Sequence, residues 1–470
     1  MKKSDIGLIG LAVMGENLVL NMESKGFTVS VYNRTVLKVD TFINSKAKGK
    51  NIFGAHSLEE FVHSLESPRK IMLMIKAGEA VDKTIEELIP FLSPGDIIID
   101  GGNSHYEDTE RRTLYVESKG LFYIGTGVSG GEEGALKGPS MMPGGSHEAW
   151  EKVKPIFTSI CAKTDSGEPC CDWVGKGGAG HFVKMVHNGI EYGDMQLICE
   201  VYHFMKNLMN FSAEDIHRVF SEWKSTELDS YLIDITTDIF TVKDEDGSPL
   251  VEKILDSAGQ KGTGKWTSVT ALDEGVPVTL ISEAVFARYL SAMKSERVEA
   301  SKELSGPYVE FKGETQEYID RLRKALYCAK IISYAQGFSL MKAVSEKKNW
   351  GLDYGNIALM WRGGCIIRSV FLDKIKEAFN KRPDLTNLML DPYFKNEILD
   401  GIESLRKVCA VSMLNGISVP SLAAALTYFD GYRSEKLPAN LLQAQRDYFG
   451  AHTYERTDFP KGKSFHTNWK

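Results

Sequence analysis

The sequence predicts an N-terminal doubly wound α/β domain, a large all-helical domain after it, and a C-terminal tail. Up to about residue 178, short apolar runs alternate with segments of helical period, a pattern typical of βαβ units and a parallel sheet. After the glycine-rich segment 175–178, no further alternating strands are expected. From about Leu437, aromatic and basic residues accumulate, with no clear helical period beyond Tyr448. We therefore divide the chain into residues 1–178, 179–436 and 437–470.

The composition narrows the class of protein. The 470 residues are 43% hydrophobic and 25% charged, with a net charge of −7, and no Lys/Arg-rich run is present. Such a chain is globular and is not built mainly to bind nucleic acid. No secretory signal and no apolar stretch of roughly 18 residues are found, which argues against a membrane protein. Because the seven cysteines are scattered, we expect a reduced, cytoplasmic protein without a disulfide framework.

Five strands, with helices between them, are expected in the first domain. Each strand ends in a turn containing Gly, Asn or Lys, and in an open α/β sheet ligands bind at the carboxyl ends of the strands. The expected strands are Ile6–Ile9 and residues 27–32, 70–75, 96–100 and 121–124, and the clearest helices are residues 15–25 and 79–91.

A glycine-rich turn follows the first strand and opens a helix. Its sequence is Gly10-Leu11-Ala12-Val13-Met14-Gly15. It matches the G-x-G-x-x-G fingerprint of dinucleotide sites, except that Ala12 replaces the second glycine. Such a turn aims backbone N–H groups and a helix N-terminus at a pyrophosphate. Similar turns also occur merely for packing, but the place of this one favours a Rossmann-like dinucleotide-binding domain.

The end of the second strand distinguishes between NAD and NADP. An NAD enzyme would place Asp or Glu on the ribose hydroxyls about 20 residues past the fingerprint. Here the sequence reads Asn33-Arg34-Thr35. Asn33 does not repel a 2′-phosphate, Thr35 can donate a hydrogen bond, and Arg34 can pair with the phosphate. Taken alone, Arg34 reads as an exposed turn residue, but together with the fingerprint it favours NADP.

One helix of the second domain carries polar residues along a single face. At 3.6 residues per turn, positions i, i+3, i+4 and i+7 share a face, and apolar residues occupy the opposite side. A solvated stripe with an internal ion pair is the ordinary interpretation. Because this helix directly follows the domain boundary, where clefts form, we favour a stripe that lines a cleft. The polar residues are Lys184, His187, Asn188 and Glu191, and the apolar ones are Phe182, Val186, Ile190 and Leu197.

Such a stripe suits acid/base chemistry without a metal. A lysine acts as a base only if its pKa, ordinarily near 10.4, is lowered by burial or by a neighbouring cation. Glu191 acts as an acid only if it is protonated at the right moment, which burial promotes. No cluster of Asp, Glu and His has the spacing of metal ligands, so we expect no metal site.

Several longer motifs accompany the fingerprint and the stripe. They are Asn33-Arg34-Thr35, Asp100-Gly101-Gly102-Asn103-Ser104, and the segments 127–135, 184–192, 261–266 and 446–452. Together they span almost the whole chain, and the sequence resembles the family of decarboxylating 6-phosphogluconate dehydrogenases.

The resemblance implies an NADP-dependent oxidative decarboxylation in the pentose phosphate pathway and gluconate utilization. In that family, 6-phosphogluconate is oxidised at C3 while NADP+ is reduced to NADPH, and the keto acid then loses CO2 to give ribulose 5-phosphate. Lys184 would accept the proton of the C3 hydroxyl and, once cationic, stabilise the enolate. Glu191 would protonate C1 of the enediol.

The resemblance also implies ligand-binding residues and a homodimer. In the family the tail reaches across from the second subunit with Arg446 and His452, so that each active site is complete only in the dimer. The implied cofactor-binding residues are Gly10, Leu11, Ala12, Val13, Met14, Gly15, Asn33, Arg34, Thr35, Ile75, Lys76, Ala77 and Asn103. The implied substrate-binding residues are Asn103, Ser129, Gly130, Gly131, His187, Asn188, Tyr192, Lys261, Thr263, Arg288, Arg446 and His452.

Three alternatives remain open from the residues alone. Residues 259–265 have the glycine and lysine spacing of a P-loop, but Trp266 stands where the Mg2+-binding Ser or Thr would be. A hydroxyacid dehydrogenase that does not decarboxylate would need no acid such as Glu191. A non-catalytic NADPH-binding protein would be expected to lack Lys184 or Glu191.

A weak internal repeat aligns Lys330 with Lys184. Seven residues after Lys330, however, Gly337 stands where an equivalent of Glu191 would be. We therefore expect Lys330 to be structural.

Overall fold

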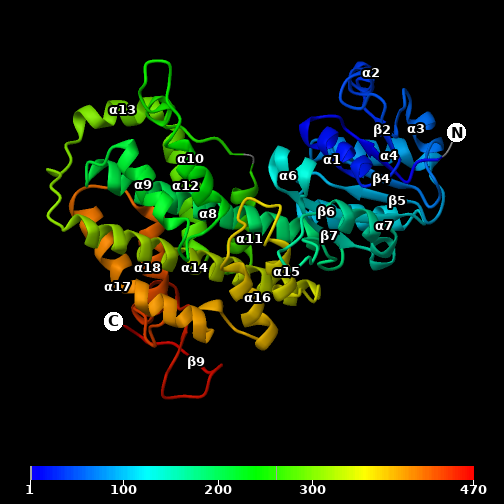
Figure 1. Ribbon diagram of the computed structural model, residues 1–470. Coiled ribbons are helices and arrows are strands. Elements are labelled where there is room, and N and C mark those ends of the chain that lie inside the picture. The colour runs from blue at the N-terminus through cyan, green and yellow to red at the C-terminus, as the bar shows by residue number, and fades with distance from the viewer. Residues whose placement is uncertain (1–2, 261, 470) are drawn as a thin grey trace.

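The computed structural model describes residues 3–260 and 262–469. Figure 1 shows a sheet-containing part, coloured blue to cyan, beside a larger part built of helices, coloured green to orange. The tail is red and lies at the lower edge of the helical part, near α17. The described residues include no helix with both the length and the apolar character to cross a lipid bilayer.

A seven-stranded sheet forms the frame of the first part. Its strand order is β3-β2-β1-β4-β5-β6-β7, and all neighbouring pairs are parallel except β6 and β7. The order reverses direction between β1 and β4, which makes the sheet doubly wound, as predicted. The strands are β1 (Ile6–Ile9), β2 (Val29–Tyr32), β3 (Ile52–Gly54), β4 (Lys70–Leu73), β5 (Ile97–Asp100), β6 (Phe122–Ser129) and β7 (Ser140–Gly145).

Helices cover both faces of this sheet. Buried side chains of α1, α2 and α7 form one apolar core on one face, and those of α3, α4 and α5 contribute to a second core on the other. This two-sided burial explains why β1 and β5 are runs of apolar residues without alternation. The helices are α1 (Val13–Ser24), α2 (Val36–Asn44), α3 (Leu58–His63), α4 (Glu79–Leu88), α5 (Tyr106–Glu117), α6 (Gly131–Lys137) and α7 (His147–Ile160).

Some expected bounds were wrong. Strand β3 was missed because it has only three half-buried residues. Strand β7 was missed because its sequence ends in Pro-Gly-Gly, which is typical of a turn rather than a strand. Strand β6 continues five residues beyond its expected end at Ile124. The helix expected over residues 79–91 changes at Leu88 into a 3-10 turn over Ile89–Phe91.

The second part is helical around two long helices, α8 and α14, which pack against each other. Its core is continuous with the sheet-containing part, since Met142 of β7 and Tyr106 of α5 belong to the same buried cluster as Phe182 of α8. The helices are α8 (Ala179–Asn207), α9 (Ala213–Trp223), α10 (Tyr231–Ile239), α11 (Thr263–Asp273), α12 (Thr279–Ala292), α13 (Lys294–Glu303), α14 (Thr315–Lys348), α15 (Tyr354–Met360), α16 (Leu372–Lys381), α17 (Pro392–Leu414) and α18 (Pro420–Tyr432).

The start of α8 lies very close to the sheet. A Cβ atom added to Gly127 of β6 would come within 2.3 Å of Lys184 Cβ, and one added to Gly180 would come within 2.3 Å of the Gly125 carbonyl oxygen. Any larger residue at these positions would push the helix away from the strand. Glycines therefore set the position of Lys184 relative to the carboxyl end of β6.

Lys330 lies on α14 and forms a buried ion pair with Asp194 of α8. Its ammonium group also lies over the rings of Tyr334 and Phe371, 5.0 and 5.3 Å from their centroids. A Cβ atom on Gly337 would come within 2.6 Å of Ile190 Cδ1, so the glycine allows α14 to approach α8. These contacts give both residues a structural role, in accordance with the expectation for Lys330.

The tail consists of α19 (Ala439–Gly450) and a small antiparallel pair, β8 (Tyr454–Glu455) and β9 (Ser464–Phe465). Asp447 is fully buried and holds several segments of the tail together. Its carboxylate accepts hydrogen bonds from Thr453 N, His466 Nδ1, Thr467 N and Trp469 Nε1 at 2.8 to 3.0 Å. Burial opposes the charged form of Asp447, but these donors lower its pKa.

Candidate active site

The fingerprint turn has the shape that its sequence predicts. Gly10 has φ +109, and a Cβ atom there would come within 2.4 Å of the Met74 carbonyl oxygen. A Cβ atom on Gly15 would come within 2.0 Å of the Gly10 carbonyl oxygen. Ala12 has extended backbone angles, φ −100 and ψ 178, so its methyl group causes no strain. No side chain caps the N-terminus of α1, which leaves its first N–H groups able to bind a phosphate.

Asn33 holds this turn against the end of β2. Leu11 N donates a hydrogen bond to Asn33 Oδ1 at 3.1 Å, and Asn33 Nδ2 donates to the Thr35 carbonyl oxygen at 3.1 Å. Arg34 and Thr35 are exposed beside it. Asn33 thus fixes the backbone of the two turns, while Arg34 and Thr35 present side chains to a ligand.

A cavity of about 350 Å³ lies between these turns and the end of β4. Four basic side chains and one acidic side chain line it, a charge balance that suits a phosphorylated ligand. Lys38 was not predicted from the sequence, although its place in the first turn of α2, four residues after Arg34, puts it beside that residue. The predicted cofactor residues that line the cavity are Gly10, Leu11, Ala12, Asn33, Arg34, Thr35, Ile75 and Lys76, and the charged residues are Arg34, Lys38, Lys76, Lys83 and Glu87.

Other predicted residues border this cavity or lie further along the sheet edge. Val13 lines a neighbouring hollow, while Met14 and Gly15 continue into α1 and Ala77 continues the turn after β4. Asn103 is exposed in the turn after β5. Ser129 is buried at the end of β6, and Gly130, with φ +120, and Gly131, with φ +62, start α6. The turns that follow parallel strands thus meet at one edge, as expected.

The polar stripe of α8 is buried rather than solvated. Lys184 and His187 are 6% and 0% exposed, and the Glu191 side chain is 20% exposed. Lys184 Nζ lies 3.3 Å from His187 Nδ1, and Glu191 Oε2 lies 3.8 Å from the same nitrogen. Ser129 Oγ lies 3.5 Å from His187 Nε2. The stripe therefore faces the end of β6, and the surface interpretation of these residues is wrong.

Burial shifts the pKa values of Lys184 and Glu191, at the two ends of the stripe, in opposite directions. Burial lowers the pKa of Lys184, and the nearby Glu191 carboxylate offsets this in part. Burial raises the pKa of Glu191, and the positive charges of Lys184 and Arg288 offset it in part. Burial also lowers the pKa of His187, so the imidazole between them stays neutral. A lysine that loses its proton more easily and a carboxyl that keeps its proton longer form a base and an acid on one helix.

Residues from distant segments join this helix. Asn188 Nδ2 donates to Thr263 Oγ1 at 3.2 Å, at the start of α11. The guanidinium carbon of Arg288 lies 3.5 Å from the centre of the Tyr192 ring, and Arg288 Nη1 donates to the Gly259 carbonyl oxygen at 3.3 Å. The fourth predicted phosphate ligand of this group, Lys261, lies outside the described residues.

Arg446 and His452 belong to the tail, and their described contacts are local to it. Arg446 Nη1 donates to Gln443 Oε1 at 3.1 Å, and the His452 ring packs edge-on against Phe449. Both side chains are exposed. Within one subunit, the described contacts of these two residues do not include the polar stripe of α8.

The P-loop-like segment has a different structural role. Residues 254–260 form no strand, and α11 begins at Thr263. Trp266 packs edge-on against His105 with the ring centroids 5.1 Å apart, which links α11 to the start of α5. Across residues 3–260 and 262–469, no group of three or more His, Cys, Asp or Glu side chains is arranged to hold a metal ion.

Comparison with known proteins gives the family. The profile described as the NAD binding domain of 6-phosphogluconate dehydrogenase matches residues 5–175, and that of the 6-phosphogluconate dehydrogenase C-terminal domain matches residues 180–469. The chain belongs to the 6-phosphogluconate dehydrogenase family.

Relatives at full length agree with this assignment. The decarboxylating 6-phosphogluconate dehydrogenase of Haemophilus ducreyi is 61% identical over 99% of this chain and 96% of its own length. The Bacillus subtilis protein named NADP(+)-dependent and decarboxylating is 61% identical over the whole of both chains. A solved structure of the Plasmodium falciparum 6-phosphogluconate dehydrogenase is 45% identical and superposes with a TM-score of 0.96 over 99% of this chain and 100% of that one.

These similarities confirm the predicted family, the fold class and the NADP-dependent, decarboxylating enzyme class. They favour that class over the non-decarboxylating hydroxyacid dehydrogenase.

Proposed function

We propose that this chain converts 6-phosphogluconate and NADP+ into ribulose 5-phosphate, CO2 and NADPH, with Lys184 as the base and Glu191 as the acid. The observation that carries the proposal is the buried stripe of α8, in which burial shifts the pKa values of these two residues in the directions that the chemistry requires. The stripe also faces the sheet edge at which the fingerprint turn lies.

The residues of the chain act in sequence on the sugar acid. NADP+, when bound, supplies the acceptor for the hydride from C3. Lys184, neutral at the start, takes the proton of the C3 hydroxyl, and the C3 carbonyl then accepts the electrons released when C1 leaves as CO2. The ammonium group of Lys184 stabilises the enolate oxygen in a site with little water. Glu191 donates a proton to the carbon that was C2 of the sugar acid, which becomes C1 of ribulose 5-phosphate.

The other binding residues are those that the family resemblance implies, and the geometry of several of them supports the assignment. The chain would hold NADP+ through residues 10–15, 33–35, 75–77 and Asn103, in keeping with the uncapped helix and the basic cavity. His187 and Asn188 would hold the sugar acid together with residues 129–131 and Asn103. Tyr192, Lys261, Thr263 and Arg288 would bind the phosphate, because three of them already lie in contact with α8 or form part of it.

A homodimer would complete the site. The tail exposes several large apolar side chains that a second subunit would cover. Arg446 and His452, which stay apart from the stripe within one subunit, would then reach the partner's active site, with Arg446 at the substrate phosphate. All seven cysteines lie in the described part as free thiols, which supports a place in the cytoplasm. The exposed apolar residues of the tail include Leu437, Leu441, Leu442, Tyr448, Phe449 and Trp469.

The reaction is tested by following NADPH absorbance with 6-phosphogluconate while the released CO2 is trapped. Formation of NADPH and CO2 in equal amounts, unaffected by a chelator, is the expected result. Reduction without CO2 would instead indicate a plain hydroxyacid dehydrogenase. NADPH binding without any reduction would leave only the dinucleotide site.

The shared site is tested with mixed dimers of Lys184→Met and Arg446→Met chains. Each variant alone should be impaired. In a mixed dimer, one site combines an intact Lys184 with an intact Arg446 from the partner, so activity should exceed the sum of the two separate variants. No gain on mixing would place Arg446 in its own subunit's site or outside both sites.

A further inference from the structure

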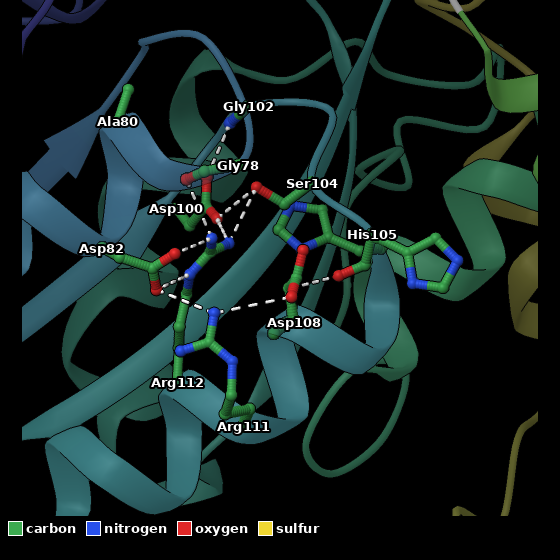
Figure 2. A network of polar contacts seen from close by, with 12 residues as sticks. Gly78, Ala80, Asp82, Asp100, Gly102, Ser104, His105, Asp108, Arg111 and Arg112 are labelled. Atoms are coloured by element: carbon green, nitrogen blue, oxygen red, sulfur yellow. Dashed lines mark hydrogen bonds and ion pairs between the residues drawn. The ribbon is translucent and has the colours of Figure 1, made fainter.

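The turns after β4 and β5 are joined by one buried guanidinium. Arg112 of α5 is 1% exposed and lies between α4 and these turns. Its Nε and Nη2 atoms donate to the two carboxylate oxygens of Asp82, both at 2.9 Å. Nη2 also donates to the Gly78 carbonyl oxygen at 3.0 Å, and Nη1 donates to Ser104 Oγ at 3.4 Å. Figure 2 shows how these partners surround the Arg112 side chain.

A second carboxylate extends the network into the turn after β5. Asp100 is fully buried at the end of β5. It accepts hydrogen bonds from Gly102 N at 3.1 Å, Ser104 Oγ at 2.6 Å and Tyr123 OH at 3.1 Å. Arg112 Nη1 lies 3.6 Å from Asp100 Oδ2 and supplies the opposite charge. The turn that carries Asn103 is thus tied on both sides of that residue, at Gly102 and at Ser104.

The two turns also touch each other directly. A Cβ atom on Gly102 would come within 3.1 Å of the Ile75 carbonyl oxygen, and Gly101 N donates to the Leu73 carbonyl oxygen at 3.0 Å. Their spacing is therefore set by backbone contact on one side and by Arg112 on the other. Arg112 engages the first turn at Gly78, directly after Ile75-Lys76-Ala77.

We infer that Arg112, with Asp82, Asp100 and Ser104, forms a positioning cluster that fixes the turn 75–78 relative to the turn 101–104, so that NADP+ is held in register with the substrate. This inference rests on the proposed function, which assigns residues 75–77 and Asn103 to the cofactor. None of these four residues is among the proposed ligand-binding residues, so the cluster would act through the backbone of the two turns.

Arginine is needed here because of its geometry. The planar guanidinium donates two parallel hydrogen bonds to Asp82 and also donates to Gly78 and Ser104. A lysine has its three donors on one nitrogen atom and cannot form such a bidentate pair. Lys at position 112 keeps the positive charge near Asp100 and Asp82 but cannot span both turns. The variant Arg112→Lys therefore separates positioning from charge neutralisation.

The neighbouring residue provides a matched control. Arg111 is on the same helix and binds the same carboxylate, with its Nη2 atom 2.9 Å from Asp82 Oδ1, and its side chain is 57% exposed. Its other described partner is Asp108, 3.4 Å away, and not a turn residue. Both arginines are visible beside Asp82 in Figure 2. Arg111→Lys thus makes the same chemical change without touching either turn.

The experiment compares Arg112→Lys, Arg111→Lys and Ser104→Ala in the full-length protein. NADPH dissociation constants are measured by fluorescence titration, together with the KM values for cofactor and sugar acid, kcat and the melting temperature. We expect Arg112→Lys to weaken NADPH binding and raise the KM for NADP+ by about 10-fold or more, since lysine loses the paired hydrogen bonds to Asp82 and the bond to Gly78. The KM for the sugar acid should change less than the KM for NADP+. Ser104→Ala should show the same pattern more weakly, and Arg111→Lys should resemble wild type.

Two results would overturn the inference. Equal NADPH affinity in Arg112→Lys and Arg111→Lys would mean that the cluster does not act on the cofactor. A lower melting temperature and kcat in Arg112→Lys and Ser104→Ala, with unchanged NADPH affinity and KM values, would mean that it only stabilises the fold. NADPH titration needs no turnover, so it decides the inference even if wild type fails to oxidise 6-phosphogluconate, an outcome that would overturn the proposed function instead.

Discussion

The cofactor half and the substrate half of the site are built in different ways. The cofactor half consists of backbone turns at one edge of the sheet, with exposed side chains such as Arg34 and Lys38 around a cavity. The substrate half consists of side chains buried along α8, with Lys184 and His187 nearly inaccessible. Exposed strand ends therefore suit binding, whereas pKa values suited to acid/base chemistry require burial.

The largest effect is expected at the base. Lys184→Met removes the only proposed proton acceptor for the C3 hydroxyl but keeps an apolar stem in the same place. We expect kcat to fall by about 10³-fold, within the range of general base catalysis, while NADPH affinity changes little. Steady-state kinetics and a fluorescence titration measure the two quantities. A loss of NADPH binding as large as the loss of kcat would break the division between the two halves.

Glu191→Gln should have the next largest effect. Glutamine keeps the shape of the side chain but cannot donate an acidic proton, so kcat should fall by about 10²-fold. The pH profile supplies a second readout. Since Lys184 works as a neutral base, activity should fall below its lowered pKa, and since Glu191 works as a protonated acid, activity should fall above its raised pKa. Glu191→Gln should lose the alkaline limb of this bell-shaped profile, and an unchanged limb would remove Glu191 as the acid.

Arg34→Glu should affect the cofactor half alone. An anion beside the 2′-phosphate replaces an attraction by a repulsion, so we expect NADP+ to bind about 10- to 100-fold more weakly, the equivalent of roughly 1.5–3 kcal/mol. NAD+ has no 2′-phosphate, so its affinity should change far less. Titration of both cofactors tests this, with Lys48→Glu, an exposed residue that does not line this cavity, as a control. Equal losses for NAD+ and NADP+ would mean that Arg34 does not recognise the 2′-phosphate.

The last effect concerns stability, and not activity, in the substrate half. Glu200 is buried on α8 and accepts hydrogen bonds from the N–H groups of Ser421 and Leu422, each at 2.8 Å. Burial raises its pKa to about 7, although these donors oppose the shift. Because the folded state holds this proton more tightly than the unfolded state does, the stabilisation is present at low pH. It is lost as the pH rises from the unfolded value through about 7.

Glu200→Gln stays neutral and should not show this loss. Between pH 5 and 8, the unfolding free energy of wild type should fall relative to the variant by about 2 to 3 kcal/mol, at roughly 1.4 kcal/mol per pKa unit. Denaturant unfolding at several pH values measures it, with the exposed Glu346→Gln as a control. A constant difference between Glu200→Gln and wild type at all pH values would contradict the burial argument.

Strands with a local sequence signal could be predicted, and strands without one could not. Strands β1 and β5 were placed almost to the residue because buried apolar runs bounded by turns are local signals. Strand β7, which ends in Pro-Gly-Gly and pairs antiparallel with β6, carries no such signal. The sequence predicts a buried strand when the strand is also apolar throughout. Strand β7 is buried along its whole length, but Pro143, Gly144 and Gly145 make up half of it and give it the composition of a turn.

In the site, too, the sequence predicts residues with a local pattern and misses those that only long-range contacts bring together. The stripe of Lys184 and Glu191 was found because helical period alone puts them on one face. The contact of Asn188 with Thr263 joins residues 75 positions apart, and only the resemblance pointed to Thr263. Arg112 was missed because a charged residue in a polar helix reads as exposed, whereas here it is buried between two turns. Long-range partners decide such cases, and no local pattern contains them.

The close approach of α8 to β6 has a consequence for the speed of the reaction. A free lysine side chain samples many rotamers, and fixing it costs roughly 2 kcal/mol of conformational entropy. Here the stem of Lys184 lies against Gly127, where even a methyl group would collide with it. The side chain is thus ordered once, when the protein folds, and not anew in every turnover. The activation barrier then contains little entropy loss from the base, so proton transfer can begin as soon as the substrate arrives.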